Sequence, residues 1–140
     1  MAVIVNPRDF PFSKKAGMPQ PIIYTHSSRV PANTAVSLSI PLAEKLTAIK
    51  PKRRAMRLEQ CFRQVLDTLP DNPVIRDFDV LFNPVYEVDI LHIMESIGKS
   101  KPFQVIWPGK YEDGRLFYAE EGYRDYKAYD LNKYNVTCII

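Results

Sequence analysis

The chain has 140 residues, of which 46% are hydrophobic and 25% are charged, and this predicts one folded domain rather than a disordered or collagen-like chain. No apolar run approaches the roughly 20 residues of a transmembrane helix, and no signal-peptide pattern begins the chain, so we expect a cytoplasmic protein without membrane contact. Residues 1–73 carry 11 Lys/Arg against 5 Asp/Glu, whereas residues 74–140 carry 8 against 11. A basic front half and an acidic back half could pair with each other, or each could bind a different partner.

The N-terminal part predicts short extended elements. Residues 1–20 contain several prolines and predict an extended segment with one short strand at Val3–Val5, ahead of a single α/β domain at 21–140. Ile22–Thr25 is the next candidate strand, and Thr34–Ile40 alternates apolar and polar residues with the period of a strand.

Two helices are expected after these strands. Pro41 is tolerated in the first turn of a helix, so it predicts a short helix at Leu42–Thr47. The clearest helix runs from about Lys52 to Leu69, because its apolar residues recur at i, i+3, i+4 and i+7. The apolar face of this helix comprises Leu58, Cys61, Phe62, Val65, Leu66 and Leu69.

The second half of the chain continues the alternation of strands and helices. Val74–Phe82 is a short apolar strand candidate, Glu87–Ile97 an amphipathic helix and Phe103–Trp107 a further strand. The strand–helix–strand–helix–strand order predicts an α/β fold with a mainly parallel sheet and helices on its faces.

The C-terminal region predicts an aromatic β-hairpin. Asp113-Gly114 is typical of a type I′ turn between Lys110–Glu112 and Arg115–Ala119. Tyr126–Leu131 and Val136–Ile140 are the last candidate strands.

Glycine placement excludes the familiar nucleotide sites. Gly17 is the only glycine before residue 74, and neither G-x-x-x-x-G-K nor G-x-G-x-x-G occurs in the chain. Such loops need several glycines because backbone amides must approach a phosphate without a Cβ in the way. A conventional P-loop or Rossmann site is therefore excluded.

The densest positive charge predicts a surface for nucleic acid or another anionic partner. The cluster comprises Lys50, Lys52, Arg53, Arg54 and Arg57, and we assign the binding to Lys52, Arg53, Arg54 and Arg57 at the start of the long helix. Guanidinium groups suit phosphates because their planar fork donates hydrogen bonds in pairs. The alternative is a solvated helix face, although positive charge at a helix N-terminus is mildly unfavourable.

Acidic residues follow the Val74–Phe82 strand pattern. Asp77 and Asp79 would point to one face of a strand and could hold Mg²⁺. The alternative is a simple ion pair with Arg76 at the strand edge, and without a phosphate loop this alternative is favoured. The two cysteines, Cys61 and Cys138, have no metal or redox spacing and are expected to be free thiols.

The aromatic tail predicts a protein interface or internal packing. Aromatic residues interleaved with basic residues can stack on bases, but the acidic residues nearby would repel phosphate. The residues that we assign to such an interface are Trp107, Tyr111, Phe117, Tyr118 and Tyr126.

Two stretches, FDVLFNP at 78–84 and WPGKYEDGRLFYAEEGYRDYKAY at 107–129, resemble the small P-loop proteins called BrxF, which belong to type 3 BREX phage-defence systems of bacteria. The similarity extends over residues 33–140. In the tail, the positions that match are Trp107, Pro108, Gly109, Gly114, Leu116, Tyr118, Ala119, Glu120, Gly122 and Tyr126.

The departures from this family concern its nucleotide site. The family begins with a strand, a Walker A loop and a helix, whereas residues 26–33 contain no glycine or lysine and leave no room for a loop and a helix. Aligning Leu81-Phe82 with the family's Walker B strand places Arg76 at the metal-holding Asp, Asp77 at the Asn and Asp79 at the Glu. A slip of one residue would restore Asp77 as a metal ligand but would not supply the missing lysine. ATP hydrolysis requires both the phosphate cradle and the metal.

The resemblance implies a non-catalytic, pseudo-ATPase-like accessory subunit with a degenerate P-loop core and no bound cofactor or metal. Its partners would be other defence-system proteins, such as the large ATPase, the PglZ-type protein and the DNA methyltransferase, and DNA is a further candidate. Two other hypotheses stay open: a free-standing nucleic-acid-binding regulator, and a weak NTPase with an unusual phosphate site.

Overall fold

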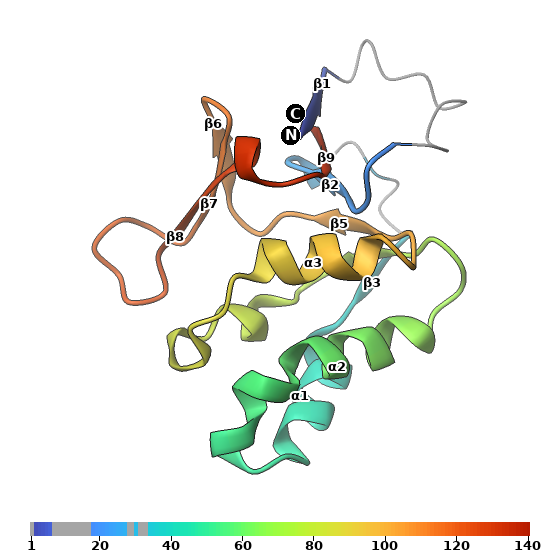
Figure 1. Cartoon of the computed structure of the whole chain (residues 1–140), viewed down its shortest axis with the longest axis vertical. Coiled ribbons are helices and arrows are strands. Elements are labelled where there is room, and N and C mark those ends of the chain that lie inside the picture. Colours follow the sequence, from blue (N-terminus) through green and yellow to red (C-terminus); the bar gives the residue numbers. More distant parts are fainter. Residues whose placement is uncertain (1, 7–17, 28–29, 31–33) are drawn as a thin grey trace.

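Six short strands form the main sheet, in the order β1-β9-β2-β5-β4-β3, and every neighbouring pair is parallel (Figure 1). This computed structural model describes residues 2–6, 18–27, 30 and 34–140. The prediction of an α/β fold with a parallel sheet is thus confirmed. The strands are β1 (Val3–Val5), β2 (Ile22–Tyr24), β3 (Ala35–Ser37), β4 (Val74–Arg76), β5 (Gln104–Ile106) and β9 (Thr137–Ile139).

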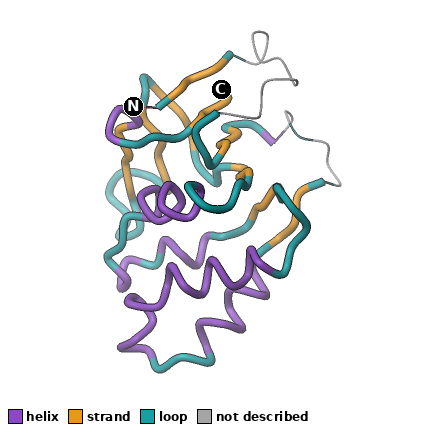
Figure 2. The backbone as a smooth tube through the Cα atoms, turned by 45° about the vertical axis from the view of Figure 1, so that its right-hand side comes forward, coloured by secondary structure: helices purple, strands orange, loops and turns teal. Residues whose placement is uncertain are grey.

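Three α-helices lie together on one side of this sheet: α1 (Ser39–Thr47), α2 (Arg54–Asp67) and α3 (Ile90–Gly98) (Figures 1 and 2). We expected helices on the faces of the sheet, but the three α-helices of the described residues all cover one face (Figures 1 and 2). Among the described residues, the buried positions of all three belong to one hydrophobic core. Strand side chains of alternate positions complete that core, among them Ile23 and Val105.

The opposite face of the sheet carries a second, smaller core. Ile22 and Tyr24, the neighbours of Ile23 in β2, are buried there with Val74 and Ile139. The hydroxyl of Tyr24 donates a hydrogen bond to Oε1 of Gln104 at 2.6 Å, so the one buried glutamine of the sheet is matched by a buried donor. Burial raises the pKa of Tyr24.

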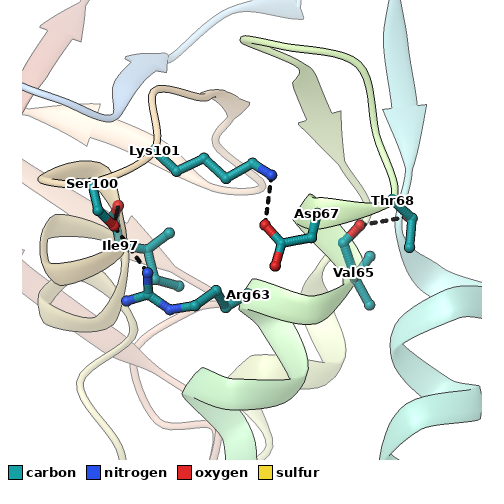
Figure 3. Close-up of polar contacts among 7 residues, drawn as sticks. All are labelled: Arg63, Val65, Asp67, Thr68, Ile97, Ser100 and Lys101. Carbon is teal, nitrogen blue, oxygen red and sulfur yellow. Dashed lines mark hydrogen bonds and ion pairs between the residues drawn. The ribbon is translucent and has the colours of Figure 1, made fainter.

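Polar contacts join the C-terminal ends of α2 and α3 (Figure 3). The guanidinium of Arg63 donates to Oγ of Ser100 at 2.9 Å, and Nζ of Lys101 is 2.7 Å from a carboxylate oxygen of Asp67. Both contacts connect α2 to the turn after α3. They therefore hold the two helices in register over the sheet.

The region around β4 differs from the sequence prediction. The predicted Val74–Phe82 strand is wrong after Arg76: Asp77 has a positive φ of 57°, and the chain then forms the 3₁₀ turn η5 (Asp79–Phe82). Phe78, Leu81 and Phe82 are buried there. Their i, i+3, i+4 spacing is helical, and a pattern read only as an apolar run conceals it.

Other boundaries shift by a few residues. The predicted Thr34–Ile40 strand covers only Ala35–Ser37, because α1 begins at Ser39 with Pro41 inside its first turn. The long helix is divided into the 3₁₀ turn η4 (Pro51–Arg53) and α2. The predicted Glu87–Ile97 helix begins only at Ile90, because Glu87 has a left-handed φ of 49° after the turn η6 (Pro84–Tyr86) and Asp89 caps α3.

A second, antiparallel sheet follows β5, in the order β6-β7-β8. Its strands are β6 (Lys110–Glu112), β7 (Arg115–Tyr118) and β8 (Lys127–Asp130). Asp113 and Gly114 both have positive φ, of 50° and 78°, which confirms the type I′ turn. The predicted aromatic hairpin is therefore a three-stranded sheet, followed by the turn η7 (Leu131–Lys133).

The ends of the sequence lie side by side in the main sheet. β1 falls within the predicted extended segment 1–20 and pairs with β9, with Val3 opposite Thr137; residues 7–17 of that segment are outside the described residues. Cys61 and Cys138 are buried free thiols, as expected. Within the described part of the chain, no helix has the length and apolar character to cross a bilayer.

Candidate functional site

The carboxyl edge of the parallel sheet is the natural place for a ligand in an open α/β fold. β2 occupies the centre of the sheet, and successive chain connections run to either side of it. Thr25 and His26 follow β2, Ser39 follows β3, and Asp77 follows β4. Because all these strands are parallel, the residues that follow them lie along one edge.

The predicted Walker B positions lie at this edge but do not form one strand face. Arg76 ends β4, and its guanidinium forms an ion pair with the carboxylate of Asp77, both side chains being about half exposed. Asp79 belongs to η5. The expectation that Asp77 and Asp79 project together from a strand is therefore wrong, because the left-handed backbone at Asp77 ends the strand first.

Asp79 faces the small sheet. It accepts a hydrogen bond from the hydroxyl of Tyr118 at 3.2 Å, and the Tyr118 ring stacks on Phe82 with 3.9 Å between centroids. Burial, and then the negative charge of Asp79, raise the pKa of Tyr118 to about 12. The carboxylate thus joins η5 to β7. Among the described residues, no group of three or more His, Cys, Asp and Glu side chains is placed to hold a metal ion.

The four predicted basic residues separate into two roles. Lys52, Arg53 and Arg57 are exposed, and none of them takes part in an ion pair within the described residues. Arg54 is half-buried, and its Nε donates to the carbonyl oxygens of Leu46 at 2.8 Å and Ile49 at 3.0 Å. We call Lys52, Arg53 and Arg57 the basic surface.

The role of Arg54 explains its position at a helix N-terminus. Positive charge there opposes the dipole of α2, but the same side chain satisfies carbonyl groups at the C-terminus of α1, where positive charge is favourable. Arg54 is therefore a structural residue of the α1–α2 hairpin.

The five predicted interface aromatics also separate into two groups. Trp107 is only 3% exposed, donates its indole N–H to the carbonyl of Phe117 at 2.8 Å, and packs in T-shaped pairs with the rings of Phe82 and Tyr129. It is part of the core rather than of an exposed surface. Tyr111 and Tyr118 pack against the same core.

The other two aromatics lie on the outer face of the small sheet. The rings of Phe117 and Tyr126 stack with 6.3 Å between centroids, and Nζ of Lys110 lies 5.4 Å from the centroid of Phe117. They line an open hollow of about 890 Å³, which we call the hairpin cup. The other side chains at its rim that matter below are Glu112, Asp113, Glu120 and Glu121.

Two structural positions were missed by sequence reasoning. A Cβ on Gly109 would lie 1.7 Å from the carbonyl oxygen of Phe117, so only glycine permits this approach of β6 to β7. Asp89 caps α3 by accepting from the amide of His92, and it also accepts from the hydroxyl of Tyr134 at 2.5 Å. An Asp directly before an apolar helical pattern is a helix-start signal that could have identified this cap.

Comparisons with protein-family models, with curated proteins and with solved structures found no match.

Proposed function

We propose that this chain is a non-catalytic accessory subunit of a bacterial anti-phage system of the BREX type, with a core derived from a P-loop ATPase that has lost its phosphate site. The observation that carries this proposal is the carboxyl edge of the main sheet. Residues 25–34 alone join β2 to β3 and contain neither glycine nor lysine. At the end of β4, Arg76 and Asp77 neutralise each other where a nucleotide-bound Mg²⁺ would need free carboxylate oxygens.

Two exposed surfaces provide the means of docking. The basic surface offers three cations without ion-pair partners among the described residues, and the hairpin cup offers paired aromatic rings with carboxylates at its rim. Aromatic side chains are enriched at protein interfaces. The resemblance to BrxF supplies the biological setting and the identity of the partners.

Affinity purification of the tagged full-length chain from its source cells tests the assembly. We expect recovery of the large ATPase, the PglZ-type protein or the methyltransferase, and a loss of at least tenfold for Phe117→Ala with Tyr126→Ala. Tyr123→Ala is the matched control, because Tyr123 is 66% exposed and does not line the cup. Recovery of none of these proteins would refute the proposal.

Isothermal titration calorimetry tests the proposal that the chain is not an ATPase. Titration with millimolar ATP and Mg²⁺ should give no binding heat, because residues 25–34 contain no glycine or lysine and no metal-binding cluster occurs among the described residues. Saturable binding would instead support the alternative of a weak NTPase with an unusual phosphate site.

The second candidate function, a nucleic-acid-binding regulator, is favoured by the basic surface. If Lys52, Arg53 and Arg57 each neutralise one phosphate, affinity for duplex DNA should fall about 40-fold between 50 and 200 mM salt. Fluorescence anisotropy with Arg53→Ala and Arg57→Ala, and with Lys99→Ala as a control on another surface, measures this slope. Absence of binding at low salt would exclude this candidate.

A further inference from the structure

The exposed start of α2 carries both charged and apolar side chains. Arg53, Met56 and Arg57 are spaced i, i+3, i+4 and lie on one side of the helix start. Met56 is 85% exposed, the largest exposure among the large hydrophobic residues described. We call these three residues the knob.

The hairpin cup has the complementary character. Lys110 lies 3.6 Å from Glu112, and Arg115 is paired in register with Glu112 on one side and Asp130 on the other. The remaining acidic groups of the rim, Asp113, Glu120 and Glu121, form no ion pair within the described residues. The cup therefore presents uncompensated negative charge around aromatic rings.

The knob and the cup are not joined by an ion pair within one molecule. The knob belongs to the α1–α2 layer, and the cup belongs to the small sheet at another part of the fold (Figure 1). The division of charge noted in the sequence is thus not resolved by contact between these two surfaces inside the chain. Each is left for a partner of opposite charge.

We infer that the knob of one molecule docks into the hairpin cup of a second copy. This rests on the proposed function only in treating the basic surface as a docking surface, and it names one partner of that surface. Arg53 and Arg57 meet the carboxylates of Glu120 and Glu121, and the thioether of Met56 meets the Tyr126 ring. The same carboxylates disfavour nucleic acid in the cup.

The contact is heterologous, because different surfaces of the two copies meet. Each added copy leaves one free knob and one free cup, so the assembly grows as a chain or closes as a ring. Exposed ion pairs are weak and screened by salt. We therefore expect a dissociation constant of about tens to hundreds of micromolar at low salt, and no association at high salt.

Sedimentation velocity across 10 µM to 1 mM protein tests the inference. At 50 mM NaCl the average mass of the wild-type chain should rise with concentration, and at 500 mM NaCl it should remain that of a monomer. Arg53→Glu with Arg57→Glu, and separately Glu120→Lys with Glu121→Lys, should each stay monomeric at 50 mM NaCl. A wild-type chain that stays monomeric throughout would overturn the inference.

Mixing the two charge-reversed variants gives the decisive measurement. Each variant repels itself, because its knob and cup have the same charge, but the mixture pairs a negative knob with a positive cup and the reverse. We expect association to return in the mixture, and a mixture that stays monomeric would overturn the inference. Met56→Ala should raise the apparent dissociation constant several-fold without changing charge.

Two controls separate specific docking from general charge effects and from misfolding. Lys99→Glu with Lys133→Glu changes the net charge as much as the reversed knob does, on exposed positions elsewhere, and should associate like the wild type. Circular dichroism checks that every variant is folded. If the wild type is monomeric but still captures defence-system proteins, the inference fails and the proposed function stands; if it associates as described but captures none, the proposed function fails alone.

Discussion

Gly109 is the glycine at which an added methyl group should lower the free energy of unfolding most. In Gly109→Ala, the new Cβ would lie 1.7 Å from the carbonyl oxygen of Phe117, whereas such contacts are normally no closer than about 3.3 Å. β6 and β7 must therefore move apart until this contact reaches a normal distance. The movement also disturbs the hydrogen bond from the Trp107 indole, because the same carbonyl accepts it.

The magnitude follows from these two losses. Forcing extra volume into a packed site costs about 1–3 kcal/mol, and a buried donor left without its acceptor costs about 1–3 kcal/mol more. We expect the free energy of unfolding to fall by about 2–6 kcal/mol. At roughly 4 °C per kcal/mol for a chain of this size, the melting temperature should fall by about 8–24 °C.

Urea and thermal unfolding followed by the emission of Trp107, the single tryptophan of the chain, measure this directly. Gly114→Ala is the matched control, because Gly114 has a φ of 78° and no atom within 4 Å of the added Cβ, so only left-handed strain of about 1 kcal/mol is expected. If Gly109→Ala melts no lower than Gly114→Ala, the close approach of β6 and β7 is not what the structure indicates.

Three further predictions concern side-chain contacts. Arg54→Ala should reduce unfolding free energy by about 1.5–3 kcal/mol through loss of its two carbonyl acceptors, whereas Arg53→Ala should leave the urea midpoint unchanged; equal effects would contradict their separate roles. The pKa of Tyr118, raised to about 12, predicts that the contribution of this hydroxyl to stability is level below pH 10 and falls between pH 10 and 12, because unfolded chains lose a proton that folded chains retain. Urea midpoints at pH 8, 10 and 11 should show a shallower fall for Tyr118→Phe, and identical slopes would refute this assignment. Asp89→Ala should cost about 2–3 kcal/mol, because it uncaps α3 and also removes the acceptor of the Tyr134 hydroxyl; thermal unfolding measures this against Asp71→Ala, which removes an exposed carboxylate without a cap.

The fold class was accessible from the sequence because its signals are local. Strand and helix periods, together with the order in which they alternate, indicate parallel pairing, and Asp113-Gly114 specifies its turn by backbone sterics alone. The end of β4 was not accessible in this way. An apolar run that turns through a left-handed Asp77 is read as one strand, and the helical spacing of Phe78, Leu81 and Phe82 is too short a pattern to locate the break at Asp77 without their packing.

The sequence predicted which residues form the clusters of the site, but it did not predict which members of each cluster stabilise the fold. The sequence identified a basic cluster and an aromatic tail, but Arg54 and Trp107 are occupied by contacts with carbonyl groups distant in the sequence. Such contacts depend on how elements pack. The favoured pairing of Arg76 with Asp77 was predictable, since the two residues are adjacent.

The insertion of β9 between β1 and β2 has a consequence for synthesis of the protein. β9 follows the other five strands of the main sheet along the chain, so a nascent chain holds β1 without its partner strand and β2 with one side open until β9 leaves the ribosome. Pairing across such a long sequence separation is slow. Cys138, whose burial raises its thiol pKa to about 12, is accordingly a built-in reporter: its resistance to alkylation marks the moment at which the sheet closes.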